Sequence, residues 1–167
     1  MWRHSTIRRV VRLTSLSLDD PTARALERAL NEEIVVRYAA DEPEEPHDAT
    51  QFAPPSGAFV VAWLQVDGGD ELPVACGGIR RLDDQRCELK RMYVVPEARG
   101  RGISRQLLGR LEDEAAALGY DAVWLETGTE QPEAIALYES SGYELVENFG
   151  RYKDEPKVRS FAKSLTP

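Results

Sequence analysis

Hydrophobic and polar residues follow two different periods along the chain, and each change of period marks a new element. Three runs rich in apolar and β-branched residues cover positions 58–66, 73–82 and 86–95. Short turn sequences, DGGD at 67–70 and DD at 83–84, separate these runs. Because such separators are typical of hairpins, the runs predict an antiparallel meander. A further short strand is expected at residues 7–13.

Helical spacing of apolar residues marks three other segments. The first is 17–39, where Asp20 is a suitable N-cap and Pro21 stands at the first helical position. The second is 103–118, which stops before a glycine, and the third is the short segment 132–141. These spacings predict three helices.

The remaining apolar runs complete a mixed sheet. Strands are expected at 121–127, 143–146 and 158–165. A helix between the strands at 86–95 and 121–127 predicts a β-α-β unit in the second half. The fold class is therefore α/β (α+β), with a mixed, mostly antiparallel central sheet flanked by helices. We expect one domain over residues 1–167.

Charge and composition exclude several classes of protein. The 167 residues carry a formal net charge of −8, which argues against a protein that coats nucleic acid. Arginines interrupt every apolar run near the start, so no secretory signal and no membrane span are expected, and the predicted location is the cytoplasm. Cys76 and Cys87 predict two half-buried free thiols, and His4 and His47 are too few for a histidine-based metal site.

A glycine-bearing loop between the strand at 86–95 and the helix at 103–118 carries the strongest chemical signal. Gly100 and Gly102 let the backbone approach a ligand, and the helix N-terminus adds partial positive charge. Arg99 and Arg101 add full charges. The loop therefore predicts a site for a polyphosphate anion, although a simple turn with two solvated arginines has the same pattern.

Two other phosphate-binding motifs fit this loop less well. A Walker loop requires a lysine followed by serine or threonine, which is absent here. A dinucleotide-binding fingerprint requires a third glycine where Arg105 stands, although Glu126 could serve as its ribose-binding acid. The antiparallel meander before the loop counts against that fold, which stays the alternative.

Two motifs resemble those of the GNAT superfamily, the acyl-CoA-dependent N-acetyltransferases. The family's [QR]-x-x-G-x-[GA] loop is matched by residues 99–104, with Ser104 where glycine or alanine is usual. Its second signature, A-x-x-L-Y-x-x-x-G-[FY], is matched by residues 134–143. The resemblance implies the acyl-CoA N-acyltransferase fold and acetyl-CoA as co-substrate, without a metal.

The resemblance also implies which residues bind acetyl-CoA. The loop backbone from Arg101 through Gly102 and Ile103 to Ser104 would bind the pyrophosphate. The strand backbone at Met92 and Val94 would pair with the pantetheine arm. The full set of expected cofactor-binding residues is Met92, Tyr93, Val94, Arg99, Gly100, Arg101, Gly102, Ile103, Ser104, Gln131 and Tyr138. Gln131 stands near the position where the family often has asparagine.

Acetyl transfer to an amine needs a base for the amine and an acid for the departing thiolate. Glu88 matches the family's usual base position, and strand alternation puts it on the face of Met92 and Val94 if no bulge intervenes. Glu126, at the end of its strand, is the second candidate. Tyr138 is the expected acid. A covalent route through Cys87 is disfavoured, because no nearby group would lower its pKa.

The acceptor is expected to be a primary amine, carried by a small molecule or peptide that is cationic. Five carboxylates in the segment 41–48 would attract a cation to the rim of the site, although the same loop could serve solubility alone. A binding module that holds coenzyme A or a dinucleotide without catalysis is the alternative function. We expect no nucleic-acid or membrane partner, and a monomer or homodimer.

Overall fold

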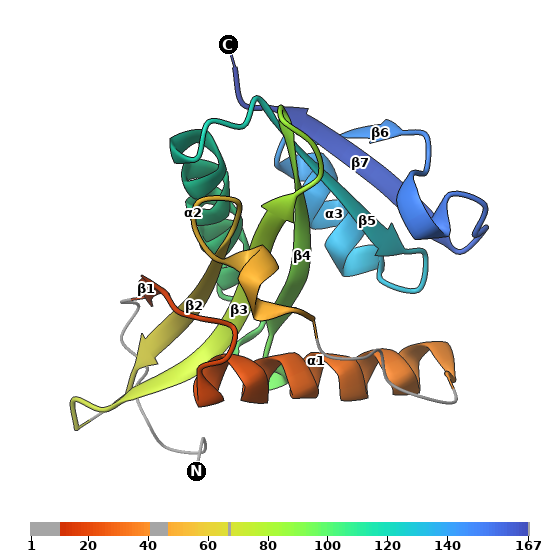
Figure 1. Cartoon of the computed structure of the whole chain (residues 1–167). Helices are drawn as coiled ribbons and strands as arrows, with labels where there is room; N and C mark the ends of the chain where they lie inside the picture. The colour runs from red at the N-terminus through yellow and green to blue at the C-terminus, as the bar shows by residue number, and fades with distance from the viewer. Residues whose placement is uncertain (1–10, 41–46, 67, 167) are drawn as a thin grey trace.

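The computed structural model describes residues 11–40, 47–66 and 68–166 of the chain (Figure 1). Within them, seven strands form one sheet in the order β1-β2-β3-β4-β5-β7-β6. The strands are β1 (Val11–Ser15), β2 (Ala58–Gln65), β3 (Glu71–Arg81), β4 (Arg86–Val94), β5 (Ala122–Gly128), β6 (Glu144–Val146) and β7 (Val158–Ser164). The α-helices are α1 (Pro21–Tyr38), α2 (Ile103–Ala117) and α3 (Pro132–Ser140), and the short 3₁₀ helices are η1 (Ala49–Phe52), η2 (Pro96–Ala98) and η3 (Gly150–Tyr152).

The sheet confirms the predicted architecture. Strands β1 to β4 form an antiparallel meander, β4 and β5 are parallel, and β7 pairs antiparallel with both β5 and β6. Helix α2 connects the parallel pair, as expected for the β-α-β unit. The first strand begins at Val11 and extends to Ser15, and residues 7–10 of the predicted strand lie outside the described residues.

Helices cover both faces of the sheet. On one face, Leu26 and Leu30 of α1 pack with Phe59 and Val61 of β2. On the other face, α2 and α3 pack against a larger apolar cluster, in which Leu107 of α2 is fully buried. The Asp20 side chain accepts a hydrogen bond from the Thr22 backbone N–H at 2.8 Å, which confirms the predicted cap of α1. No helix in the described part of the chain is long and apolar enough to cross a membrane.

A β-bulge interrupts β4. The register of β4 against β3 shifts between Cys76 and Gly78, where two residues of β4, Arg91 and Met92, oppose one residue of β3. Arg91 takes a positive φ of 63°, which is uncommon for a residue other than glycine. A bulge of this kind reverses the alternation of side chains for the rest of the strand.

Because of the bulge, Glu88 lies on the opposite face of the sheet from the one expected. Met92 and Val94 pack into the apolar cluster on the α2 side, whereas Glu88 binds Arg80, whose guanidinium reaches Gln51 of η1 on the α1 side. Glu88 therefore does not share a face with Met92 and Val94. The shared face was expected only in the absence of a bulge, and the extra residue at the bulge inverts every position after it.

The two parallel strands at the centre of the sheet separate after a short paired stretch. Strands β4 and β5 pair from Arg86 and Ala122 to Leu89 and Leu125. Beyond Leu89, β4 continues to Val94 and β5 continues to Gly128 without further pairing between them. Figure 1 shows the two strands diverging in this region. The backbone edges that face this opening are free to bind something other than the neighbouring strand.

Candidate active site

The loop after β4 has the backbone conformation that its glycines predict. Gly100 and Gly102 take φ values of +73° and +76°, and a Cβ built on either would have no atom within 4 Å. Glycine is therefore needed here for the backbone conformation and not for tight packing. Since α2 begins at Ile103, its first backbone N–H groups have no acceptor within the helix and face the loop. This is the geometry of an anion site.

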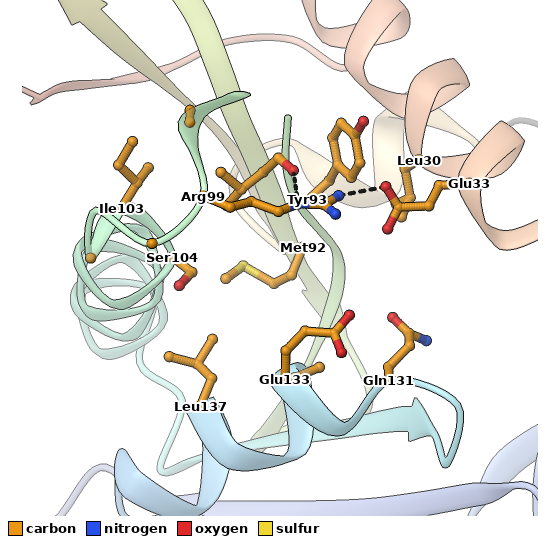
Figure 2. A pocket seen from close by; sticks show the side chains of 15 residues that line it. Leu30, Glu33, Met92, Tyr93, Arg99, Ile103, Ser104, Gln131, Glu133 and Leu137 are labelled. Atoms are coloured by element: carbon orange, nitrogen blue, oxygen red, sulfur yellow. Dashed lines mark hydrogen bonds and ion pairs between the residues drawn. The ribbon is translucent and has the colours of Figure 1, made fainter. Parts of the chain in front are cut away.

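A cavity of about 220 Å³ lies beside this loop (Figure 2). Figure 2 shows side chains from four parts of the chain around it: α1, β4, the loop with the start of α2, and α3. The cavity is lined by nine of the expected cofactor residues, namely Met92, Tyr93, Val94, Arg99, Gly100, Gly102, Ile103, Ser104 and Gln131. Arg101 is exposed and Tyr138 lines a neighbouring cavity instead.

Arg99 is bound within the protein. Its Nε donates to the Val94 carbonyl at 2.9 Å, and its guanidinium forms an ion pair with Glu33 of α1 (Figure 2). The guanidinium also lies 5.8 Å from the centre of the Tyr93 ring. The positive charge of Arg99 is therefore shared with Glu33 of α1, and the phosphate loop does not have the full free charge expected from the sequence.

A second cavity, of about 290 Å³, opens where β4 and β5 separate. It brings together the three residues predicted for catalysis, because Glu88, Glu126 and Tyr138 all line it. Met92 and Gln131 line both cavities, so the two spaces are adjacent. The structure therefore joins the predicted cofactor residues and the predicted catalytic residues in one region.

Two cations hold the Glu88 carboxylate. The Nε of Arg80 donates to one oxygen at 2.9 Å, and the Nζ of Lys90 lies 3.6 Å from the other. The Glu88 side chain is only 7% exposed. Both oxygens of Glu88 are thus already engaged with positive charge.

Glu126 has a different environment on the same face of the sheet. Its side chain has no hydrogen bond or ion pair to any residue in the part of the chain that the structure describes. Removal from water raises the pKa of Glu126, and repulsion from Glu88 raises it further, against smaller opposing effects of Lys90 and Arg80. Glu126 is therefore an uncompensated carboxylate that accepts a proton more readily than an ordinary glutamate.

Tyr138 is held by aromatic packing. Its ring lies 5.7 Å from that of Tyr143 and 6.4 Å from that of Phe161. Burial strongly raises the pKa of Tyr138, so its hydroxyl stays protonated at neutral pH. Among the described residues, the hydroxyl has no hydrogen-bond partner within the protein. A protonated donor therefore lines the cavity that contains Glu126.

The two cysteines have inert surroundings. Both are fully buried, where half-buried thiols were expected, because β3 and β4 lie at the centre of the sheet. Burial raises the pKa of Cys87 to about 12 and raises that of Cys76 as well. Since a thiolate is the reactive form, neither cysteine has the environment of a nucleophile.

The acidic segment falls largely outside the described residues. Of the predicted rim at 41–48, residues 41–46 are not described. Asp48 accepts hydrogen bonds from the backbone N–H and hydroxyl of Thr50, at 2.9 and 2.8 Å, and so caps η1. His47 contacts the guanidinium of Arg91. The described end of the segment therefore has a structural role.

Comparison with known proteins identifies the family. The model of the acetyltransferase (GNAT) family matches residues 24–143, which include the loop, the splayed strands and α3. The chain belongs to the GNAT family. The uncharacterized N-acetyltransferase YsnE of Bacillus subtilis is 31% identical over 155 residues, which are 90% of this chain and 99% of that protein. An IAA acetyltransferase of Azospirillum brasilense is 47% identical over 94 residues, and this match covers 55% of the chain and 61% of that protein.

Solved GNAT structures share the fold. A protein assigned as an acyl-CoA N-acyltransferase in Klebsiella pneumoniae superposes with a TM-score of 0.75 at 27% identity, over 95% of this chain and all of that one. A GNAT acetyltransferase of Elizabethkingia anophelis with acetyl-CoA bound superposes with a TM-score of 0.63 at 15% identity, over 92% of this chain and 97% of that one. The GNAT fold excludes the doubly wound dinucleotide-binding fold, which requires a largely parallel sheet.

Several residues of this GNAT site were not found from the sequence. Arg80 lies directly across the β3–β4 hairpin from Glu88, and Lys90 is two residues from Glu88 on the same strand. Hairpin register and strand alternation could have found both. Glu33 of α1 and Glu133 of α3 line the first cavity, and Arg37 binds both of them. Contacts between elements so distant in sequence leave no local signal.

Proposed function

We propose that this GNAT protein transfers an acetyl group from acetyl-CoA to a primary amine, by direct attack of the amine in the opening between β4 and β5. One observation carries the proposal. A carboxylate with a raised pKa and a protonated tyrosine hydroxyl line the same cavity, and that cavity adjoins the glycine loop. These are the base and the acid that amine acetylation requires.

The residues around the first cavity fit acetyl-CoA as co-substrate. The open backbone from Arg101 to Ser104 would bind the pyrophosphate through N–H groups at the start of α2. The unpaired edge of β4 at Met92 and Val94 would receive the pantetheine arm, with Gln131, the N-cap of α3, on the other side of the cavity. The Val94 carbonyl already accepts from Arg99, so pantetheine would have to use that carbonyl's second lone pair or displace Arg99.

Glu126 is the preferred base in this proposal, ahead of Glu88. At pH 7 a lysine-like ammonium must lose its proton at a cost of about 4–5 kcal/mol before it can attack. Glu126 has free oxygens and a raised pKa, which suit it to take that proton directly or through water. Glu88 is neutralised by Arg80 and Lys90 and instead raises the basicity of Glu126 by repulsion.

Tyr138 supplies the proton for the departing thiolate. A hydroxyl that stays protonated at neutral pH can hydrogen-bond the sulfur and transfer its proton as the carbon–sulfur bond breaks. Glu126 takes one proton from the ammonium, and the neutral nitrogen then attacks the thioester carbonyl. The carbon–sulfur bond breaks as the thiolate takes the Tyr138 proton, so coenzyme A departs as the thiol. The second proton that the nitrogen loses returns through water to the tyrosinate. The fully buried Cys87 takes no part, so no acetyl-enzyme is formed.

The test is acetyl transfer by the purified protein. Acetyl-CoA is mixed with a panel of amino acids, polyamines, aminoglycosides and lysine peptides, and release of the free thiol is followed against time. We expect thiol release that depends on the amine and saturates with it. If acetyl-CoA binds but no amine accelerates thiol release above its hydrolysis, the protein is a binding module and the proposal is wrong.

A further inference from the structure

A third cavity extends the acceptor side of the site. It has a volume of about 500 Å³ and is lined by Thr50, Gln51, Ser56, Arg80, Arg81, Leu82 and Glu88. Glu88 lines this cavity and also the second one, so the two adjoin at this residue. Apart from Leu82, the lining side chains are polar or charged. A molecule that brings its amine to Glu126 can therefore extend past Glu88 towards arginine, hydroxyl and amide groups.

Four charged groups lie along this path, namely Arg80, Glu88, Lys90 and Glu126. Arg80 and Lys90 share the single carboxylate of Glu88, which leaves one net positive charge among these three groups. Glu126 adds one negative charge in the second cavity, which Lys90 also lines. The four groups are close enough to influence one another, because Glu88, Lys90 and Arg80 all affect the pKa of Glu126. The charges of these four groups sum to zero, and the other arginines that line the two cavities, Arg81 and Arg91, pair with Asp84 and Glu27.

Arg80 retains donors for a ligand. Its Nε binds Glu88 and one terminal nitrogen binds the Gln51 side chain, both at 2.9 Å. The other terminal nitrogen donates to no described residue, and the side chain is 26% exposed. Because guanidinium has five N–H donors in a planar fork, Arg80 can hold Glu88 and still bind a second carboxylate.

Apolar side chains line the second cavity beside its charged residues. Ile34 and Tyr38 of α1, Tyr152 of η3 and Val158 of β7 provide these surfaces. Tyr38 lies directly over the end of β5, where its hydroxyl occupies the space of a Cβ on Gly128. This wall lies at the Gly128 end of β5, whereas Arg80 is level with Trp124, so its apolar surface favours the part of an acceptor near Glu126 and not the chain towards Arg80.

We infer that the acceptor is a zwitterion, in which a primary amine reaches Glu126 while a carboxylate at the other end of a short aliphatic chain binds Arg80. This inference rests on the proposed acetyl transfer and narrows its substrate class. It replaces the purely cationic acceptor expected from the acidic segment. Arg80 and Glu126 lie on strands two positions apart in the sheet and about two residues apart along it, so their Cα atoms are separated by about 12 Å.

The test compares acids with their amides in direct binding. Straight-chain ω-amino acids with two to six methylene groups, and the matching ω-amino amides, are titrated calorimetrically into the wild-type protein saturated with coenzyme A. We expect at least one acid to bind about tenfold or more tightly than its amide. Equal binding, tighter binding of the amides, or no binding of any acid overturns the inference.

Substitutions test whether Arg80 causes the preference for the acid over its amide. Arg80→Gln should bring the ratio of acid to amide affinity close to one, while Arg80→Lys should retain part of it. Arg12→Gln is the matched control, since Arg12 also pairs with a glutamate across strands but lies at the β1 edge, and it should keep the wild-type ratio. A ratio that survives Arg80→Gln also overturns the inference. If Arg80→Gln does not fold, the wild-type and Arg80→Lys ratios decide.

This binding test is independent of the test of acetyl transfer. Amines that are acetylated without any preference for a carboxylate would leave the proposed function standing and refute the zwitterionic acceptor. The opposite outcome is that acids bind through Arg80 but neither they nor any other amine is acetylated. That outcome would refute the proposed function and leave the carboxylate-binding site at Arg80 standing.

Discussion

At the scale of single residues, the site gives different properties to two glutamates on neighbouring strands. Glu88 and Glu126 face the same cavity, but only Glu88 has cations on both oxygens. The sequence identified both and ranked Glu88 first. The sequence alone does not give the environments that distinguish them. Arg80 reaches Glu88 because the two residues pair across the β3–β4 hairpin, and the raised pKa of Glu126 depends on its burial.

Tyr138→Phe isolates the proposed acid. General acid catalysis typically contributes 10²–10⁴-fold, so we expect kcat to fall by about that factor while acetyl-CoA affinity changes little. Steady-state kinetics and calorimetry measure the two quantities. Tyr120→Phe is the control, because the Tyr120 hydroxyl donates to the Ser56 carbonyl outside the cavity that holds Glu126, and it should keep wild-type turnover. Wild-type turnover in Tyr138→Phe would mean that Tyr138 only packs.

At the scale of elements, the bulge in β4 decides which side chains reach which face. The guanidinium of Arg91 is buried against α1, where it donates to Asn31 Oδ1 at 2.8 Å and lies 3.6 Å from Glu27 Oε1. His47 also contacts it. These contacts hold a residue with positive φ in place, and the bulge then turns Met92 towards the cofactor cavity. No local pattern in the sequence predicted this bulge.

Arg91→Ala should weaken the fold. Removing one partner of a buried charged network costs about 3 kcal/mol, and Glu27 would keep its pair with Arg24 and its contacts with His47 but lose a buried cation. We expect the free energy of unfolding in urea to fall by about that amount. Arg12→Ala, which removes an exposed ion pair, should have a much smaller effect. Equal losses in the two variants would contradict a special role for the bulge contacts.

The glycine loop allows a second prediction at this scale. Gly102→Asp places a negative charge and a side chain beside the proposed pyrophosphate site, so acetyl-CoA binding should be lost in a protein that still folds. Gly69→Asp is the matched control, with a φ of +89° and equally open space in the β2–β3 turn. It should bind acetyl-CoA normally. Normal binding by folded Gly102→Asp would refute the cofactor site.

At the scale of the whole molecule, the sequence predicted the element order and the mixed sheet well. Periodicity, turn residues and caps such as Asp20 act locally, and the order of elements follows from them. Residues of the loop at 99–104 line the first cavity, and Tyr138 of the motif at 134–143 lines the second. What the sequence missed are contacts between distant elements, such as Arg37 of α1 binding Glu133 of α3, which exist only once the layers are packed.

Cofactor choice is testable on the whole protein. A ligand at one hundred times its Kd stabilises the folded state by about 2.7 kcal/mol, which corresponds to a rise in Tm of about 5–11 °C for a chain of this size. We expect such a rise with acetyl-CoA and none with NADH in thermal unfolding. A rise with NADH alone would favour the dinucleotide alternative.

The most direct test of the account is the pH dependence of acetyl transfer in Glu126→Gln. Below the raised pKa of Glu126 the carboxyl is protonated and cannot accept the amine proton, so wild-type kcat/KM should increase as the pH rises through that pKa. Glu126→Gln should lower kcat/KM and lose this acidic limb, while Glu88→Gln should keep a limb that is moved to lower pH, because repulsion from Glu88 is removed. An unchanged limb in Glu126→Gln, or its disappearance only in Glu88→Gln, would contradict the assignment of Glu126 as the base.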